Sequence, residues 1–192
     1  MMKRSLLALA LLAMLPLSAQ AADGLSYSYV ELGYNRASID GLDADPDGFS
    51  LKGSAAVGAQ FYLFGSYFNG SDSIEGFDFD YDQTQLGLGY HHAMSDRSDF
   101  LAEISYVNAK VAVDDFDADG DGYRVSAGFR GLMADNFEGY IKGNWNDGSD
   151  IDGDFSGTLG AQYKFNATWG ITAEAEFGND ASIYGVGVRA SF

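Results

Sequence analysis

Several features that are common in proteins are scarce in this chain. Its 192 residues include no cysteine, two prolines and two histidines. The absence of cysteine excludes disulfide bonds, thiol nucleophiles and thiolate metal ligands. Beyond the first residues there is no apolar run of about 20 residues, the length that a transmembrane helix needs. A membrane-spanning helix in residues 22–192 is therefore excluded.

The amino-terminal segment has the composition of a secretory signal peptide. Lys3 and Arg4 form a positive region, residues 5–15 are mainly apolar, and Ala19-Gln-Ala21 has the small residues of a cleavage site. The apolar run is too short to span a bilayer comfortably, which argues against a retained anchor helix. We therefore expect residues 1–21 to be removed and residues 22–192 to form one domain.

Basic residues are scarce as well. Removal of the leader leaves nine lysines and arginines against 28 acids, a net charge of −19. A chain of this charge is repelled by phosphates, so we expect no nucleic-acid partner. Glycine (25) and aromatic residues (28) are abundant, and this aromatic content argues against disorder.

Apolar and polar residues alternate in ten segments. In the last segment, Tyr184 and Val186 fall on one face, and Gly185 and Arg189 fall on the other. A period of two indicates a strand with one apolar and one polar face. Both faces of the third segment carry aromatic residues, which leaves its orientation open. The predicted strands span residues 26–36, 49–57, 61–69, 83–92, 99–110, 122–132, 137–146, 155–165, 169–177 and 182–192.

The links between these segments alternate in length, which is typical of transmembrane barrels with long outer and short periplasmic connections. Aromatic residues recur at both ends of the apolar faces, as expected for two interfacial girdles. We therefore predict an all-β fold, an antiparallel up-and-down transmembrane β-barrel of ten strands, or of eight if two segments are loop hairpins. The long links are 37–48, 70–82, 111–121 and 147–154, and the short ones are 58–60, 93–98, 133–136 and 166–168; the link 178–181 breaks the rule.

The predicted polar faces carry acids and bases in nearly equal number. Charges inside a narrow lumen must be paired or hydrated. The mixture therefore predicts ion pairs and a plugged lumen rather than a wide pore. The members of this predicted lumen network are Glu31, Lys52, Glu103, Arg124, Arg130, Glu138, Lys142, Lys164, Glu174, Glu176 and Arg189.

The four long links and the last link hold nineteen acids and no lysine or arginine. Two runs, 43–48 and 115–120, match the start of a calcium loop, in which alternate carboxylates converge on one cation. Both runs lack the glutamate at position twelve, where Ser54 and Ser126 stand. The alternatives are loose attraction of Ca²⁺ or Mg²⁺ and divalent cations that bridge the loops to lipopolysaccharide phosphates. The candidate calcium ligands are Asp43, Asp45, Asp47, Asp115, Asp117 and Asp119.

No catalytic motif accompanies these acids. Acyl-transfer sites combine a histidine with a serine or a carboxylate. His91 and His92 are predicted at the periplasmic end of a strand, away from the long links. The sequence contains no phosphate loop, dinucleotide fingerprint or nucleophile elbow. We expect a protein that is not an enzyme and has no cofactor apart from such divalent cations.

Several segments resemble known families. The final strand resembles the C-terminal strand that the barrel-assembly machinery recognises in bacterial outer-membrane barrels. The positions of that assembly signal are occupied here by Gly187, Ala190 and Phe192. The whole chain resembles small outer-membrane barrels of the OmpX and opacity-protein type, and in particular the activator of XA-mediated immunity ("Ax") family. The segments that match are the leader 3–24, Tyr29-Val-Glu31, Leu86-Gly-Leu-Gly-Tyr90, Asn136-Phe-Glu-Gly-Tyr140 and Gly160-Ala-Gln-Tyr-Lys-Phe-Asn166.

This resemblance implies a location in the outer membrane and in outer-membrane vesicles, with outer-membrane lipid and lipopolysaccharide as neighbours. It carries over no site residues. With the acidic links, we expect a structural or adhesive role, or a role in envelope homeostasis and surface interaction. The alternatives are a narrow pore for small solutes or ions and, third, a soluble periplasmic β-sandwich, which would fold without detergent.

Deletion of Phe192 is expected to impair assembly, because the terminal aromatic residue belongs to the predicted assembly signal. The measurement is the amount of heat-modifiable protein in the outer-membrane fraction, compared with a Phe192→Tyr control that keeps an aromatic end. Unchanged membrane levels after the deletion would count against this role.

Overall fold

A computed structural model describes residues 24–39, 45–74, 77–113, 116–149, 153–179 and 181–192. The predicted leader, residues 1–21, lies outside this range, as do Asp43 and Asp115. Within the described residues, no helix is both long enough and apolar enough to cross a bilayer.

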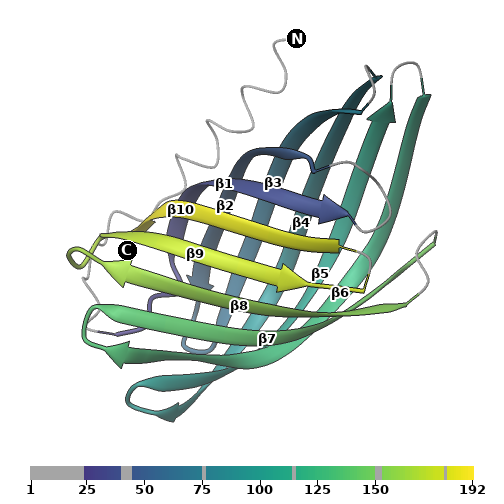
Figure 1. Cartoon of the computed structure of the whole chain (residues 1–192). Helices are drawn as coiled ribbons and strands as arrows, with labels where there is room; N and C mark the ends of the chain where they lie inside the picture. The colour runs from purple at the N-terminus through teal and green to yellow at the C-terminus, as the bar shows by residue number, and fades with distance from the viewer. Residues whose placement is uncertain (1–23, 40–44, 75–76, 114–115, 150–152, 180) are drawn as a thin grey trace.

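Within the described ranges, ten strands form a closed antiparallel barrel in which each strand pairs with the next and the last pairs with the first (Figure 1). The prediction of ten strands is therefore confirmed, and the eight-stranded alternative is wrong. The strands are β1 (Tyr29–Ile39), β2 (Asp47–Val57), β3 (Phe61–Ile74), β4 (Phe77–Ser95), β5 (Ser98–Val113), β6 (Phe116–Ala134), β7 (Phe137–Gly148), β8 (Asp154–Lys164), β9 (Trp169–Phe177) and β10 (Ala181–Ser191).

The barrel closes between its first and last strands. β1 and β10 pair over eleven positions, from Tyr29 opposite Ser191 to Ile39 opposite Ala181. The Phe192 amide donates one further hydrogen bond, 2.9 Å long, to the Ser28 carbonyl. Closure gives every strand two neighbours, which removes the free edges that an open sheet would present.

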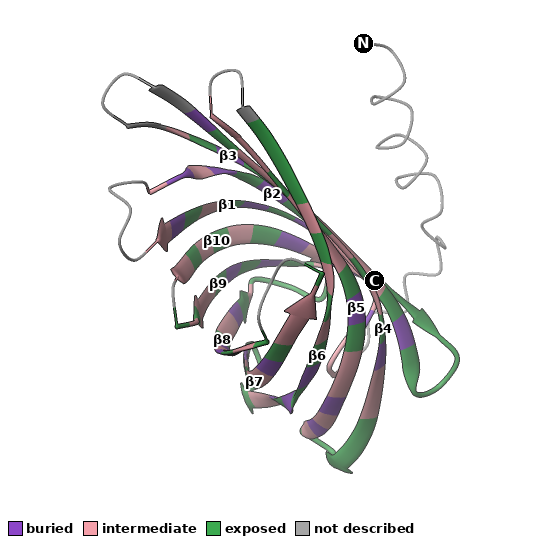
Figure 2. Ribbon diagram, turned by 90° about the vertical axis from the view of Figure 1, so that its right-hand side faces the viewer, coloured by how far each residue is buried: buried purple, intermediate pink, exposed green. Residues whose placement is uncertain are grey.

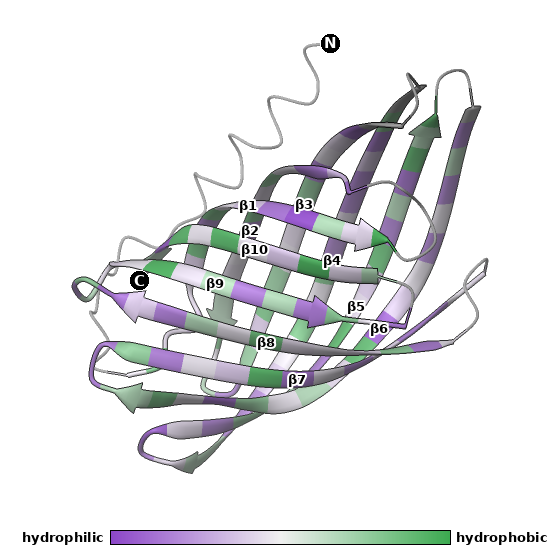
Figure 3. Cartoon of the chain, viewed as in Figure 1, coloured by the Kyte–Doolittle hydropathy of each residue, from purple (hydrophilic) through white to green (hydrophobic). Residues whose placement is uncertain are grey.

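The two faces of the barrel reverse the usual arrangement of a soluble protein, as the alternating bands of Figures 2 and 3 show. Leu32 and Ile104 on the outer face are 60% and 55% exposed, whereas Glu138 on the inner face is fully buried. In β3, whose orientation the sequence left open, Leu63 is exposed and Tyr62 is buried inside. An apolar exterior around a polar interior is what a lipid environment requires of a barrel.

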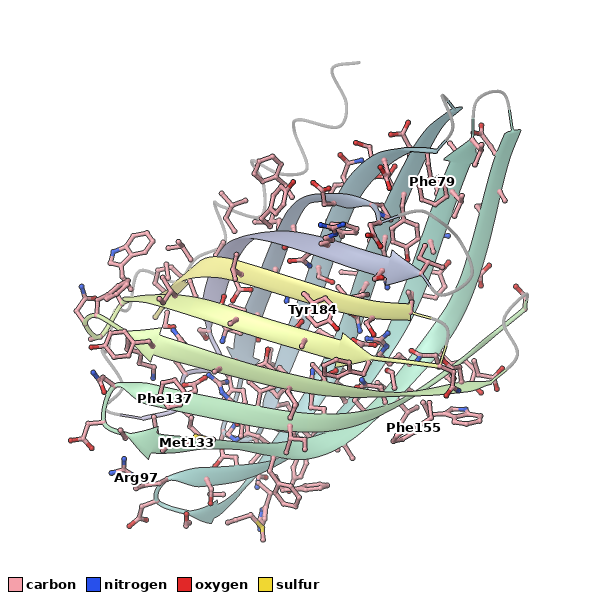
Figure 4. All side chains as sticks on the ribbon, in the orientation of Figure 1. Phe79, Arg97, Met133, Phe137, Phe155 and Tyr184 are labelled. Carbon is pink, nitrogen blue, oxygen red and sulfur yellow. The ribbon has the colours of Figure 1, made fainter. Side chains whose placement is uncertain are left out.

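Exposed aromatic side chains lie toward both ends of the outer face. Figure 4 labels Phe137 near the end where the chain terminates and Phe155 toward the other end. The end with the terminus corresponds to the predicted periplasmic side. Aromatic rings at both levels match the belts with which barrels contact the two interfaces of a bilayer. The outer belt includes Tyr34, Phe49, Tyr106, Tyr123, Trp145, Phe155, Phe177 and Tyr184.

The strands that most exceed their predicted lengths are β3, β4, β5 and β6. β3 and β4 cover most of residues 70–82, and β5 and β6 cover most of residues 111–121, both of which we predicted to be links. These stretches are rich in Asp and Gly, residues that are depleted in strands. Their composition therefore gave no indication that they pair as strands. The two hairpins rise beyond the other strands (Figure 1).

The effect of a charged substitution on the outer face is expected to depend on its depth in the membrane. Ile104 lies midway along the apolar face of β5, between Phe100 and Tyr106. We expect Ile104→Arg to lower the free energy of unfolding by about 2–4 kcal/mol, because arginine at mid-membrane depth is poorly solvated. Reversible urea unfolding in phospholipid vesicles measures this change. Asn108→Arg, beyond the aromatic belt on the same face, is the matched control and should change little.

Candidate functional site

The candidate site is the lumen, which contains a cavity of about 170 Å³ lined by charged and aromatic side chains. Among the described residues, the three layers of the lumen and its periplasmic end contain six acids and six bases, because Asp99 joins the eleven residues of the predicted network. Sequence reasoning missed Asp99, which stands at the start of its strand beside a turn. This part of the interior is therefore neutral in formal charge.

The layer nearest the periplasmic end centres on Glu138 of β7. Arg130 of β6 donates from Nε to Glu138 Oε1 at 2.8 Å, and the Lys164 Nζ of β8 is 3.3 Å from Glu138 Oε2. Arg189 of β10 donates from Nε to Glu31 Oε2 of β1 at 2.8 Å, and its Nη1 lies 4.0 Å from Glu138 Oε1. Three bases from three strands thus surround one buried carboxylate.

The middle layer repeats one arrangement twice, with a lysine and a tyrosine on one carboxylate. Lys142 Nζ lies 3.0 Å from Glu103, and the Tyr62 hydroxyl donates to the same carboxylate at 2.7 Å. Lys52 Nζ lies 2.8 Å from Glu174, to which the Tyr140 hydroxyl also donates. Each carboxylate therefore has a positive partner and a second donor, which offsets the cost of removing it from water.

The layer nearest the outer end is an ion pair between β6 and β9. Arg124 Nη2 lies 2.9 Å from Glu176 Oε1, and the Ser156 hydroxyl donates to the same oxygen at 2.8 Å. Arg124 Nε also donates to the Asn146 side chain at 2.6 Å. All eleven residues of the predicted network therefore form ion pairs. Lys52–Glu174 and Arg124–Glu176 join strands that are not neighbours, whereas pairs such as Arg130–Glu138 and Arg189–Glu31 join adjacent strands.

The lumen also holds Tyr27, which precedes β1 and is only 7% exposed. Its hydroxyl donates to Asp99 at 2.7 Å, and its ring stacks on His91 with the centroids 3.9 Å apart. The ring centroid lies 4.9 Å from the Tyr62 centroid and 4.9 Å from the Arg130 guanidinium carbon. Tyr27 thus occupies part of the lumen near its periplasmic end. The sequence placed Tyr27 in the first predicted strand, 26–36, whereas β1 begins at Tyr29, and the alternating pattern gave no indication of these contacts.

Two lumen glycines make room for the aromatic rings. A Cβ atom on Gly89 would collide with the Tyr62 ring, and one on Gly160 would collide with the Tyr140 ring. In the strand register Gly89 is directly opposite Tyr62, and Gly160 is directly opposite Tyr140. The rings therefore lie flat across adjacent strands and fill space that side chains would otherwise occupy.

The two histidines lie on opposite faces of β4. His91 stacks against Tyr27 in the lumen, and its Nδ1 is 3.3 Å from Asp99. His92 is exposed on the outer face. The described contacts of His91 are therefore those of a packing partner for the segment that precedes β1.

The candidate calcium ligands in the described ranges are Asp45, Asp47, Asp117 and Asp119. Arg36 Nη2 donates to Asp45 at 2.6 Å, and this hydrogen bond lowers the pKa of the Asp45 carboxyl. Asp47 accepts from the Tyr34 hydroxyl. In the described parts of the chain, no three His, Asp or Glu side chains are grouped closely enough to hold a metal ion. Calcium binding stays a prediction.

The predicted assembly signal lies along the closing seam. Gly187 is opposite Gly33 of β1 and Thr172 of β9, and Ala190 is opposite Val30. The Phe192 carbonyl accepts a hydrogen bond from Ser26 Oγ at 2.9 Å. Its role as a recognition signal stays a prediction.

The closed barrel, its apolar exterior and its ion-paired lumen agree with the protein family that matches the sequence. The outer-membrane protein β-barrel domain family matches residues 7–192. The chain belongs to this family. This outer-membrane barrel is therefore located in the outer membrane, and the periplasmic β-sandwich alternative is wrong.

Solved structures that resemble this outer-membrane barrel share little of its sequence. The KdgM porin is 15% identical, with 84% of this chain and 99% of that chain covered and a TM-score of 0.48. Ail, the attachment invasion locus protein of Yersinia pestis, is 16% identical over 85% and 98% of the two chains, with a TM-score of 0.43. The N-terminal β-barrel domain of Pseudomonas aeruginosa OprF is 14% identical over 88% and 100%, with a TM-score of 0.46. Comparison with curated proteins gave no match.

Removal of the central carboxylate should destabilise this outer-membrane barrel strongly. Glu138→Ala leaves Arg130 and Lys164 buried without their partner, and we expect a loss of about 3–5 kcal/mol in the free energy of unfolding. Urea unfolding in vesicles measures it. Asp135→Asn, which removes the exposed partner of Arg97, is the control and should have almost no effect. Equal stabilities of the two variants would contradict the assignment of Glu138 as the centre of the layer.

Proposed function

We propose that this outer-membrane barrel is not an enzyme and acts as a closed membrane anchor that presents an acidic outer end at the cell surface. Its role is structural or adhesive, in envelope homeostasis and surface interaction. The observation that carries the proposal is the occupation of the lumen by Tyr27 and by the ion pairs Lys52–Glu174 and Arg124–Glu176, which join strands that are not neighbours. Membership of the Ax family and release in vesicles belong to the same proposal.

The energetics of the lumen support a closed state. Removing one partner of a buried ion pair between strands lowers the stability of the barrel strongly, because the other charge stays buried without a partner. Opening a path through the middle and outer layers would require the Lys52–Glu174 and Arg124–Glu176 pairs to separate. The lysines and arginines of the described lumen therefore link strands of the barrel. A solute that enters the lumen would have to compete with the carboxylates for these bases.

The outer end differs sharply from the lumen in charge. Among the described residues of this end, ten acids stand against two bases, Arg36 and Lys110. Such a surface attracts cations and cationic partners and repels lipopolysaccharide phosphates unless divalent cations intervene. Recognition through charge at the outer surface is therefore the form of interaction that we propose. The acids are Asp45, Asp47, Asp72, Asp80, Asp82, Asp117, Asp119, Asp121, Asp147 and Asp154.

A narrow pore is the second candidate, and the 170 Å³ cavity in the lumen is the observation that favours it. The cavity is lined by polar groups from Asn35 and Ser50 near the outer end to Arg130 near the periplasmic end. Withdrawal of Tyr27 would extend this space toward the periplasm. The two functions differ in whether the resting barrel conducts.

Planar-bilayer recordings distinguish these functions. We expect no steady conductance steps from the wild-type barrel, and more frequent openings from Tyr27→Ala, which empties the slot between His91, Tyr62 and Arg130. Addition of p-cresol, which has the shape of the missing side chain, should reduce these openings. His92→Ala, at the same end but outside the lumen, is the control. Steady steps from the wild-type protein would overturn the closed-anchor proposal.

A further inference from the structure

The outer face of the barrel is hollowed near its periplasmic end. A groove of about 820 Å³ crosses β6, β7, β8 and β9 there. In the strand register Gly131 is opposite Gly139, Gly139 is opposite Ala161, and Ala161 is opposite Ala173. These four small residues form one continuous row across four strands. We call the groove above this row the trough.

Bulky side chains bound the trough on both sides. The neighbouring rows in the register consist of exposed aromatic and branched residues, so the small residues between them leave a channel in the lipid-facing wall. Met133 reaches over Gly139, and its flexible side chain can shift along this channel. The bounding residues are Phe129, Ile141 and Leu159 on the outer side and Phe137, Tyr163 and Ile171 on the periplasmic side.

The trough runs obliquely from the periplasmic interface toward the middle of the membrane, because the strands of a barrel are tilted. The row begins at Ser98, the first residue of β5, which is opposite Gly131, and it reaches Ala173, the fifth residue of β9. The four steps between neighbouring strands cover about 19 Å at ~4.8 Å each. One leaflet of hydrocarbon is roughly 15 Å thick. An oblique acyl chain in the trough therefore spans about one leaflet.

Polar side chains line the trough at its periplasmic mouth. Ser95, Arg97 and Ser98 belong to the connection between β4 and β5, and Figure 4 labels Arg97 at this end of the barrel near Met133. Among the described residues of the periplasmic turns, Arg97 is the only lysine or arginine. The trough is therefore amphipathic, with charge at the interface and an apolar surface within the membrane.

The mouth carries charges of both signs. Arg97 Nη1 is 3.2 Å from Asp135 Oδ1, and the two side chains are 51% and 97% exposed, so both can still contact a headgroup. A guanidinium donates two hydrogen bonds to a phosphate, and a carboxylate accepts hydrogen bonds from a primary ammonium. A headgroup with one phosphate and one ammonium matches Arg97 and Asp135 together. A headgroup with a phosphate alone is repelled by Asp135 and by the exposed Asp96 beside it.

Other occupants fit the trough less well. Lipopolysaccharide lies in the opposite leaflet, so its phosphates are far from Arg97. A second barrel has a convex wall that would rest on the two bulky rows, whereas an acyl chain is thin enough to reach the row of small residues. An apolar molecule without a headgroup would leave the charges at the mouth unused.

We infer that the trough binds one phospholipid of the periplasmic leaflet whose headgroup contains a phosphate and a primary ammonium, as in phosphatidylethanolamine. One acyl chain lies along the row from Gly131 to Ala173. The phosphate contacts Arg97, and the ammonium contacts Asp135. The site is on the lipid-facing side of the wall, so lipid binding does not depend on whether the lumen conducts.

The test uses the mature barrel in a mild detergent, incubated with phosphatidylethanolamine, phosphatidylcholine or phosphatidylglycerol of identical acyl chains. Native mass spectrometry counts the lipids that each barrel retains. We expect one phosphatidylethanolamine per barrel, retained about threefold more than phosphatidylcholine, which has a positive charge but no N–H donor. Phosphatidylglycerol, which has no positive charge, should be retained least.

One pair of variants tests the trough itself. Ala161→Leu with Ala173→Leu fills the channel and should lower the retention of all three lipids roughly tenfold, because the acyl chain loses its apolar contact. Ala55→Leu with Ala127→Leu is the matched control, since it adds the same bulk at exposed outer-face positions outside the trough. Heat-modifiable mobility on gels checks that each variant is folded.

Two single variants test the mouth. Arg97→Gln should lower the retention of all three lipids about threefold, because each of them contains a phosphate. Asp135→Asn should remove the preference for phosphatidylethanolamine over phosphatidylcholine. Arg36→Gln is the control, because Arg36 is also an exposed arginine paired with an aspartate but stands at the outer end.

Three outcomes would overturn the inference. They are equal retention of the three lipids by the wild-type barrel, wild-type retention by the variant with a filled trough, and unchanged retention after Arg97→Gln. Dimers in place of lipid-bound monomers would also overturn it, because they would show that a second copy covers the trough.

Discussion

The bilayer offers no hydrogen-bond partners, so each backbone amide and carbonyl at membrane depth must find its partner in a neighbouring strand. The seam between β1 and β10 meets this requirement across eleven paired positions. Once the sheet is closed, every strand has one lipid face and one lumen face. The alternation of side chains, the apolar exterior and the confinement of charges inside all depend on that closure.

Closure also creates the interior that must then be filled. Ten strands enclose a space that tyrosine rings and paired charges occupy, with Glu138 at the centre of three bases and Tyr27 near the periplasmic end. A neutral set of charges is important here, because a surplus of either sign would leave ions buried without partners. The lumen thus stabilises the barrel, and the exposed outer end is left to interact with other molecules.

Beyond the outer aromatic belt the solvent changes from lipid to water, and the sheet changes with it. Lys110 and Asp119, opposite each other on β5 and β6, face outward where Ile104 and Val125 do so within the membrane. The same strands therefore turn apolar residues outward within the membrane and charged residues outward beyond it. The sequence did not reveal how far these strands extend, because acidic, glycine-rich residues look like links when each stretch is considered without its partner strand.

The alternation with a period of two and the division of charges between the faces were determined by the sequence alone, because neighbouring residues in a strand necessarily point to opposite faces. The choice between ten and eight strands was decided only by the closed sheet. The orientation of β3 was not determined by the sequence either, since Tyr62 and Leu63 are both apolar and only the closed sheet assigns Tyr62 to the lumen. Pairings such as Arg189 with Glu31, 158 residues apart, required the tertiary structure. So did the entry of Tyr27 and the extension of the hairpins, because strand register and closure bring together residues whose contact no local pattern records.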